Sequence, residues 1–470
     1  MFRFGGLTGH CGGKLLDVAS SVDERIEPRR LWAPAERAAA RAGDMRWVTA
    51  AGRAVLIFMP CYTIMGPRFS TGLGLAAASL LTAVWLIALR SAFAAVHFTL
   101  GVPIRCAVGT ATGFVAVSAV ALWVPGLGMS GWTILALALA VFTLTTIWEI
   151  VAQRVVAKRR VLVVGTSSSA ADIADAVEFE GHTPFAVIGV VDDESDDDTR
   201  LGSVAELSQV IDEQRPDLIV LTDSKTSAKA LDRLLAAPTD GLKVVGLAHF
   251  FDHAFGRIPL DELTPTWFMS IFHVWKRPYT RFAKRTFDVV CASLGLLLSA
   301  PLWPVIALLV WLTPGPVIYR QTRVGEGGKH FTMFKFRTMC VDAETDRATY
   351  AQVGDARVTR LGRALRTSHL DELPQFWNVL KGDMSIVGPR PERPEFIPML
   401  EEAVPFFSRR LLIKPGVTGW AQLRSDYSSD VEGAADKLSY DLWYLRHRNL
   451  VVDLAICAKT FSAVLLRPGR

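Results

Sequence analysis

The chain has 470 residues, of which 50% are hydrophobic and 21% are charged, and its mean hydropathy is positive. That length corresponds to about three domains of ordinary size. The composition excludes an intrinsically disordered chain and disfavours a purely soluble enzyme, because disorder requires few apolar residues and many charges. We therefore expect several membrane segments combined with soluble domains.

Charge is distributed unevenly along the chain. The net charge is +5, but residues 276–470 contain 28 Lys or Arg and 19 Asp or Glu, which gives +9, and residues 1–275 carry −4. A basic module beside apolar segments favours phosphate-rich ligands or an anionic membrane surface. We expect no nucleic-acid partner, because no basic repeat with interleaved stacking aromatics occurs. The six cysteines form no Cys-x-x-Cys pair, so we expect reduced thiols.

Residues 47–153 predict four transmembrane helices. No charged residue occurs in residues 106–148, and Pro125-Gly126 divides this stretch into two runs of about the 20 residues that a span needs. Gly72–Leu89 is a third uncharged run. Trp47–Pro67 is a weaker fourth, because it contains an arginine.

The charges that flank these four runs predict the topology. Lys and Arg residues precede the first run and follow the fourth, and such residues mark cytoplasmic loops. An even number of spans returns the chain to the side where it began. We therefore expect residues 1–46 to be a cytoplasmic tail, not a cleavable signal peptide, since they contain no early apolar run.

A fifth apolar stretch, Val289–Leu312, is long enough to cross the membrane but has basic residues on both sides. Ser299-Ala300-Pro301 and Pro304 lie near its centre, where proline removes backbone donors and can break a helix. The stretch therefore predicts a re-entrant membrane hairpin over residues 286–313. An ordinary span with a proline kink is the alternative. The hydropathy and the prolines alone favour the hairpin and the kinked span about equally.

Residues 159–265 predict a Rossmann-like α/β domain on the cytoplasmic side, because short apolar runs typical of buried strands alternate with helical stretches. The strand candidates are Arg160–Gly165, Phe185–Val191, Leu218–Leu221 and Lys243–Leu247, and the helical candidates are Ala170–Glu178, Ser203–Gln214 and Ser227–Leu235.

The first turn of this domain argues against a bound dinucleotide. It contains only Gly165, followed by three serines, where a Gly-x-Gly-x-x-Gly pattern would be expected. Asp192 could contact a ribose, but it opens an acidic run over residues 192–198, which favours a solvated loop. We therefore expect this domain to serve regulation or subunit contact.

Residues 276–470 carry most of the chemically active side chains. Phe alternates with cations in Phe334–Met339, which predicts a strand with Lys335 and Arg337 on the face opposite the aromatic rings. A set of arginines spaced by three predicts a basic stripe on a following helix: Arg357, Arg360, Arg363 and Arg366.

Asp371 and Glu372 follow this stripe directly. Pro374 suits the first turn of a helix over Gln375–Leu380, which places both carboxylates at the N-terminal end of that helix. Adjacent helical side chains do not face the same way, so we expect one carboxylate to attack and the other to hold Mg²⁺ or manage a proton. Carboxylates, cations and a helix N-terminus together indicate phosphoryl transfer.

The proline-rich block over residues 381–394 supplies further candidates. Asp383, Arg390 and Arg393 suit a diphosphate or uridine pocket, although a surface ion pair is the alternative for any single arginine. We expect His369 to be structural. Ile456–Val464 and its basic neighbours predict an interfacial helix or, equally, a packed one. The full set of predicted substrate-binding residues is Lys335, Arg337, Arg360, Arg366, Asp383, Arg390 and Arg393.

In this order the blocks resemble the bacterial sugar transferases called polyprenyl-phosphate hexose-1-phosphate transferases. The resemblance covers residues 276–470, and the four spans with a Rossmann-like domain resemble the long members of that family. The motifs that carry it are Phe334-Lys-Phe-Arg-Thr-Met339, Leu370-Asp-Glu-Leu-Pro-Gln375, Asn378-Val-Leu-Lys-Gly-Asp-Met-Ser385, Val387-Gly-Pro-Arg-Pro391 and Lys414-Pro-Gly-Val-Thr-Gly-Trp420.

The resemblance implies transfer of hexose-1-phosphate from a UDP-hexose to undecaprenyl phosphate, with release of UMP, at the start of exopolysaccharide or capsule synthesis. It implies that Asp371 is the nucleophile that forms a covalent phospho-sugar, that Glu372 is its partner associated with Mg²⁺, and that the membrane helix turns back at Ser299 and Pro301. It also implies a small α/β monotopic catalytic domain on the cytoplasmic side of the bacterial inner membrane. We expect glucose as the sugar, then galactose, and a homodimer.

Two rival functions are disfavoured. A nucleotide-sugar dehydratase or epimerase would need the glycine fingerprint, and none of the seven tyrosines has a lysine four residues later, the spacing such enzymes commonly use. A membrane receptor would leave the adjacent cation and carboxylate blocks without a purpose.

Overall fold

The computed structural model describes residues 39–96, 98–123, 128–155, 158–179, 183–193, 199–222, 229–234, 242–263, 267–268, 278–341, 343, 355–425 and 431–466. Most of the predicted tail 1–46, the Pro125-Gly126 break, much of the acidic run 192–198 and part of the predicted helix Ser227–Leu235 lie outside these residues. Two compact units are present, one built around the sheet of Val155–Gly246 and one containing Val48–Arg154 and Leu247–Arg470.

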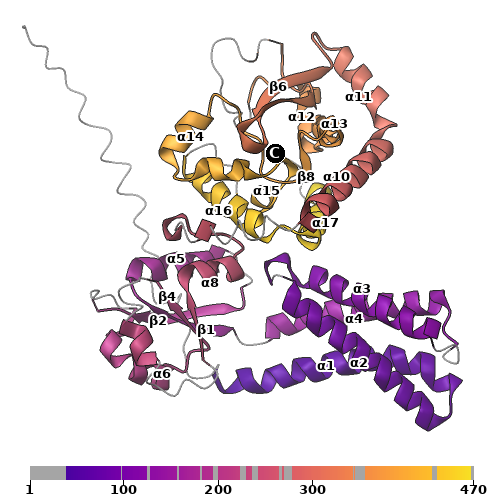
Figure 1. Ribbon diagram of the computed structural model, residues 1–470, viewed down its shortest axis with the longest axis vertical. Helices are drawn as coiled ribbons and strands as arrows, with labels where there is room; N and C mark the ends of the chain where they lie inside the picture. Colours follow the sequence, from indigo (N-terminus) through magenta and orange to yellow (C-terminus); the bar gives the residue numbers. More distant parts are fainter. Residues whose placement is uncertain are drawn as a thin grey trace, which may run out of the picture. The chain divides into compact units, whose positions relative to one another are not determined.

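In the part of the chain that the structure describes, four helices are long and apolar enough to cross a membrane, as the sequence predicts. They are α1 (Ala39–Met65), α2 (Thr71–Ala95), α3 (Val102–Trp123) and α4 (Gly131–Val155), labelled in Figure 1. Arg53, which interrupts the first apolar run, lies 2.6 Å from Glu149 near the end of α4. The pairing neutralises both charges, and this explains how the first helix tolerates an arginine.

The middle of the chain forms a five-stranded, all-parallel sheet in the order β3-β2-β1-β4-β5. The parallel α/β class is therefore confirmed. The strands are β1 (Arg159–Val164), β2 (Phe185–Val191), β3 (Arg200–Gly202), β4 (Leu218–Leu221) and β5 (Lys243–Gly246), and the helices of this region are α5 (Ser167–Phe179) and α6 (Leu207–Gln214).

Two expectations for this region need correction. Asp192 is buried at the end of β2 and its backbone N–H donates to the Gly202 carbonyl, so it is not a solvated loop residue. Residues 247–263, which we placed with the sheet, pack on the C-terminal domain instead. There α8 (Leu247–Ala254) accepts a hydrogen bond from Trp443 at the Asp252 carbonyl, 3.0 Å.

The C-terminal domain contains two small sheets surrounded by short helices. An antiparallel pair, β6 (Ile318–Val324) and β7 (His330–Phe336), and a parallel pair, β8 (Ser385–Val387) and β9 (Gly416–Thr418), form the sheets. The core is rich in aromatic residues, and Trp420 stacks on Trp443 with ring centroids 5.0 Å apart. The helices are α12 (Arg360–Thr367), α13 (Gln375–Lys381), α14 (Ile397–Ala403), α15 (Trp420–Arg424), α16 (Val431–His447) and α17 (Leu450–Leu466).

The fifth apolar stretch forms two helices, α10 (Pro278–Ser299) and α11 (Leu302–Trp311), which are bent by 67° at the break between them (Figure 1). The Ser299 hydroxyl accepts a hydrogen bond from the Trp303 indole at 3.1 Å and so bridges the break. Pro304 lies in the first turn of α11, where a missing backbone donor costs nothing. A single break, at Ala300-Pro301, therefore bends this helix pair.

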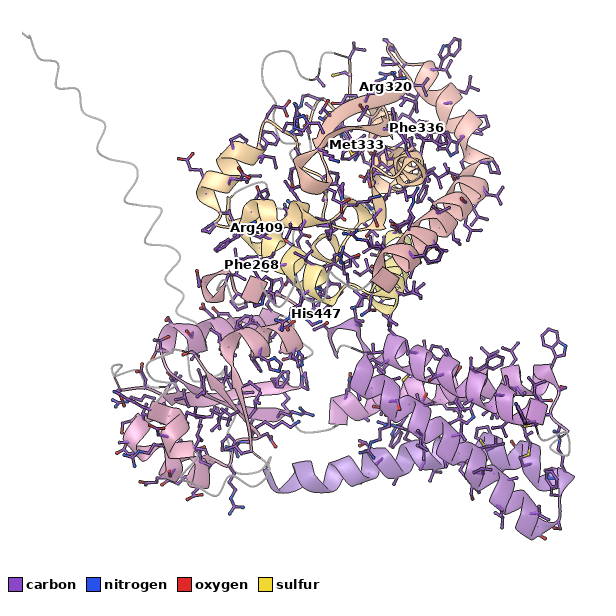
Figure 2. All side chains as sticks on the ribbon, viewed as in Figure 1. Phe268, Arg320, Met333, Phe336, Arg409 and His447 are labelled. Atoms are coloured by element: carbon purple, nitrogen blue, oxygen red, sulfur yellow. The ribbon has the colours of Figure 1, made fainter. Side chains whose placement is uncertain are left out.

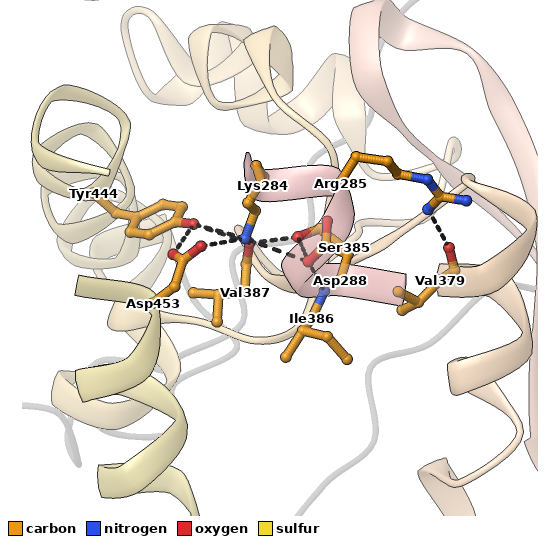
Figure 3. Close-up of polar contacts among 9 residues, drawn as sticks. All are labelled: Lys284, Arg285, Asp288, Val379, Ser385, Ile386, Val387, Tyr444 and Asp453. Atoms are coloured by element: carbon orange, nitrogen blue, oxygen red, sulfur yellow. Dashed lines mark hydrogen bonds and ion pairs between the residues drawn. The ribbon is translucent and has the colours of Figure 1, made fainter. Parts of the chain in front are cut away.

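A buried polar network attaches the start of α10 to the C-terminal domain (Figure 3). The Lys284 ammonium lies 2.7 Å from Asp453 on α17 and 3.5 Å from Asp288, and donates to the Val387 carbonyl at 3.0 Å. Both carboxylate side chains are only 3% exposed. Asp288 in turn accepts hydrogen bonds from the Ser385 hydroxyl and from the Ile386 backbone N–H. One lysine thus compensates two buried carboxylates.

We expect Lys284→Met to lower the free energy of unfolding by about 3 kcal/mol, because removing one partner of a buried pair leaves an uncompensated charge. Thermal unfolding of the detergent-solubilised protein measures the effect. Lys381→Met is the matched control: its side chain is 53% exposed and, among the described residues, its one ion pair is with Asp383, so the loss should stay under about 1 kcal/mol. Equal losses of unfolding free energy in the two variants would contradict the conclusion that Lys284 compensates two buried carboxylates.

Candidate active site

The two adjacent carboxylates lie in a turn between two short helices. Thr359 caps α12 by accepting a hydrogen bond from the Gly362 N–H at 2.9 Å. His369 then adopts a left-handed conformation, φ 56°, and turns the chain into the 3₁₀ turn Leu370–Glu372. The predicted helix is present as α13, with Pro374 at its N-cap position, directly before the first turn. Asp371 and Glu372 therefore precede the N-terminal end of α13, and His369 shapes the turn.

Asn378 on α13 brings this turn against strand β7. Its side chain is fully buried, accepts a hydrogen bond from the Phe334 N–H at 3.1 Å and donates to the Thr332 carbonyl at 2.7 Å. These two bonds fix α13 beside the strand that carries Lys335. Figure 2 labels Met333 and Phe336 on the same strand. Asn378 lies in one of the sequence motifs, but no local pattern predicts the contacts that it makes.

Glu372 is held by two cations. Its Oε1 lies 2.7 Å from the Lys335 ammonium and 3.3 Å from the Arg390 guanidinium. Burial by itself would raise the pKa of Glu372, but the two cations outweigh burial and hold that pKa at about 2. Burial lowers the pKa of Lys335, and Glu372 opposes that effect. Glu372 is therefore ionised at neutral pH.

Asp371 has a different environment. It is 5% exposed, and within the part of the chain that the structure describes its carboxylate forms neither a hydrogen bond nor an ion pair. Burial raises the pKa of Asp371, the Glu372 charge adds to this, and the nearby cations of Lys335, Arg366 and Arg390 oppose it. A buried carboxylate without hydrogen bonds, close to cations, is available to react. The two neighbours thus have opposite pKa shifts, which indicates separate roles.

Among the described residues, the remaining predicted ones do not bond either carboxylate: each is exposed or has another partner. Arg366 is held by a 2.9 Å hydrogen bond from its Nε to the Thr338 hydroxyl. Arg360 is exposed at the first position of α12. Arg393 contacts Glu395 at 3.5 Å and stacks over Phe396. Asp383 follows the other end of α13, about 10 Å along that helix, and pairs with Lys381.

Arg337 is not placed as we expected. Its guanidinium is buried and donates to the carbonyls of Val310, Thr313 and Pro316 and to the Thr313 hydroxyl, at 2.8–3.1 Å. Lys335 and Arg337 therefore do not act on one partner: the first meets Glu372 and the second caps the end of α11. The physical reason is that the last carbonyls of a helix lack donors, and a guanidinium can satisfy several of them at once.

Two further arginines support the proline-rich block. Arg323 donates to the Pro391 carbonyl at 2.9 Å and to the Gln321 side chain. Arg410 donates to the Arg390 carbonyl at 3.0 Å and pairs with buried Asp441 at 2.8 Å. Both therefore fix the backbone that presents Arg390. Neither arginine is in the set of site residues that the sequence predicts.

The donor set at the turn fits a magnesium ion. Mg²⁺ binds through one or two carboxylates and substrate phosphates. Both contacts of Glu372 use Oε1, and the described residues make none to Oε2. The ionised Glu372 carboxylate is a ligand of the kind that such an ion requires. With several cations nearby, the site can bind phosphates and present a carboxylate to phosphorus.

Comparison with known proteins agrees with this chemistry. The family model described as "Bacterial sugar transferase" matches residues 279–467. The chain is 40% identical over 211 residues to the UDP-N-acetylgalactosamine-undecaprenyl-phosphate N-acetylgalactosaminephosphotransferase of Aeromonas hydrophila, covering 45% of this chain and 49% of that protein. It is 47% identical over 154 residues to a putative undecaprenyl-phosphate N-acetylgalactosaminyl 1-phosphate transferase of Bacillus subtilis, covering 33% of this chain and 81% of that protein.

A longer match is found with the UDP-glucose:undecaprenyl-phosphate glucose-1-phosphate transferase of Escherichia coli K12, at 32% identity over 308 residues, 64% of this chain and 66% of that protein. The protein therefore belongs to the bacterial sugar transferase family, as the motifs indicate. The match spans about half the length of the Aeromonas relative.

A double-mutant cycle measures the pair that holds Glu372. We expect Lys335→Met alone to destabilise the protein strongly, because Glu372 keeps its charge in a buried site, and Lys335→Met combined with Glu372→Gln to recover part of the loss. The coupling free energy should be about 2–3 kcal/mol. Denaturant unfolding of the wild type, both single variants and the double variant gives this value. Additive losses would show that the two side chains do not interact.

Proposed function

We propose that this protein transfers hexose-1-phosphate from a UDP-hexose to undecaprenyl phosphate through a covalent intermediate on Asp371. The observation that carries the proposal is the contrast within the carboxylate pair. Asp371 is buried and makes no hydrogen bond or ion pair among the described residues, whereas Glu372 is neutralised by Lys335 and Arg390. A nucleophile needs a lone pair that no neighbour occupies.

The reaction has two balanced halves. An Asp371 carboxylate oxygen attacks the β-phosphorus of the UDP-hexose, forming an O–P bond while the bond between that phosphorus and the bridging oxygen breaks and UMP leaves. A phosphate oxygen of undecaprenyl phosphate then attacks the same phosphorus and releases Asp371. Lys335, Arg366 and Arg390 oppose the rise in the pKa of Asp371 and so favour its ionised, nucleophilic form. Arg390 is half exposed and can neutralise the leaving phosphate.

Glu372 would hold Mg²⁺, with substrate phosphates among its other ligands, which leaves the Asp371 carboxylate to attack phosphorus. When bound, the ion supplies charge neutralisation at the diphosphate. Lys335 orients the Glu372 carboxylate through Oε1. The Asn378 bonds keep the whole turn against β7, so that both carboxylates approach the substrate from one rigid surface.

We propose that α10 and α11 form a re-entrant hairpin. The apolar part of α10 after Asp288 and the ten residues of α11 are each about 15 Å long, half of the hydrocarbon thickness. Both ends attach to one domain. Lys284 and Arg285 bond β8, α13 and α17 at the start, and Arg337 bonds the carbonyls at the end of α11. Two ends bound to one domain must lie on the same side of the membrane.

This topology supports the predicted location, in the bacterial inner membrane with the catalytic domain on the cytoplasmic side, where a water-soluble UDP-sugar is available. The hairpin would hold the site at the height of the lipid phosphate. We propose that the parallel sheet is a Rossmann-like domain without a catalytic cofactor, since its first turn contains Gly165 followed by serines. A regulatory role or a homodimer contact is our proposal for it.

Glucose is our first choice of sugar. The relative whose match extends over 64% of this chain is named for glucose, whereas the two named for N-acetylgalactosamine match shorter stretches at higher identity. A protein of Salmonella typhimurium that is 38% identical over 207 residues is named for galactose. Sugar hydroxyls are read by pocket geometry, so the donors must be compared directly.

We expect Asp371→Asn to abolish UMP release and lipid-linked product, because an amide cannot attack phosphorus. The measurement uses detergent-solubilised protein with Mg²⁺, undecaprenyl phosphate and, separately, UDP-glucose, UDP-galactose and UDP-N-acetylgalactosamine. Asp261→Asn, an exposed carboxylate elsewhere in the same unit, is the matched control and should keep full activity. UMP release by the Asp371→Asn variant at the wild-type rate would refute the nucleophile assignment.

The hairpin predicts that the exposed thiol of Cys340 faces the cytoplasm. In a variant that keeps Cys340 as its only cysteine, a membrane-impermeant maleimide should label the protein only after the inner membrane is opened. Adding Ser70→Cys, at the exposed turn between α1 and α2, should give labelling in intact spheroplasts. Labelling of Cys340 without permeabilisation would favour a kinked span.

A further inference from the structure

A histidine cluster lies outside the candidate active site, on helix α8. His249 and His253 are one helical turn apart, with ring centroids separated by 4.3 Å, and Asp252 lies next to them. One ligand atom from each of the three residues lies within 4.8 Å of the others. Two imidazoles at positions i and i+4 on one helix face are a spacing that binds zinc. Tetrahedral zinc ligands lie about 3.3 Å apart, so small side-chain rotations would close the site.

Residues of α16 already orient the carboxylate. Asp252 is 1% exposed, its Oδ1 lies 2.7 Å from Nε2 of His447, which Figure 2 labels, and its carbonyl accepts the Trp443 indole bond. Ligating side chains in metal sites are typically held by such an outer hydrogen bond. Both rings on α8 are exposed, so a metal ion can reach them.

The charges around the cluster allow an additional cation. Arg446 contacts Asp252 Oδ2 at 3.5 Å, longer than a strong charged hydrogen bond, and its side chain is 31% exposed and can move into solvent.

We propose that His249, Asp252 and His253 form a binding site for a divalent transition metal of the zinc type, with His447 holding the Asp252 carboxylate as an outer partner. Two imidazole nitrogens and one carboxylate oxygen suit Zn²⁺ and not Mg²⁺, which prefers oxygen ligands. Because Asp252 is anchored to α16, a bound ion would stiffen the junction of α8 and α16. The proposal does not depend on the transferase activity.

The test is zinc binding by the full-length, detergent-solubilised protein without a histidine tag, after chelator treatment. Isothermal titration with ZnCl₂ in the presence of excess Mg²⁺ gives stoichiometry and affinity, and Co²⁺ absorption shows whether thiolates are ligands. The variants are the pair His249→Ala with His253→Ala, the outer-partner change His447→Gln, and the control His330→Ala, an exposed histidine on β7. Far-UV circular dichroism verifies that each variant is folded.

We expect one Zn²⁺ per wild-type chain, a cobalt spectrum without thiolate bands, and a rise in the thermal midpoint with zinc. The paired substitution should remove this binding and the midpoint rise, and His330→Ala should change neither. His447→Gln should weaken affinity by about 10–100-fold. Wild-type binding no stronger than that of the paired variant, or thiolate bands in the cobalt spectrum, would overturn the proposal.

Discussion

The ion pair between Lys335 and Glu372 is the interaction on which the candidate active site depends. An ionised carboxylate is costly to bury without a partner, so burial alone would raise the pKa of Glu372. The charges of Lys335 and Arg390 outweigh burial and lower that pKa to about 2. Asp371, one residue earlier, makes no such bond among the described residues and its pKa is raised. Two cations that contact only the second of two neighbouring carboxylates thus give the pair different chemistry.

The pair can form only because the surrounding backbone is held in place. Asn378 fixes α13 to β7, and Arg323 and Arg410 fix the block that presents Arg390. Each of these side chains forms a hydrogen bond with backbone atoms of another segment. Each therefore fixes the position of that segment. The site is therefore carried by a rigid domain, as precise placement of reacting groups requires.

The bent pair of helices α10 and α11 is subject to a second constraint, because its ends are bonded to the same domain. Lys284 compensates two carboxylates at one end, and Arg337 satisfies helix carbonyls at the other. The basic residues that flank the apolar stretch thus have internal partners in addition to any lipid headgroups. This arrangement supports a domain attached to one membrane surface more than a crossing helix.

The sequence by itself determined the four apolar helices, the parallel α/β class, the family and the helix that follows Pro374, because each depends on local periodicity or on contiguous motifs. Only the tertiary structure decided which cations reach Glu372 and which serve elsewhere. Lys335 and Arg337 are two residues apart on one segment, yet one meets a carboxylate and the other a helix end. Long-range packing selects such partners, as it does for Asp252 and His447, which are 195 residues apart and which no sequence pattern links.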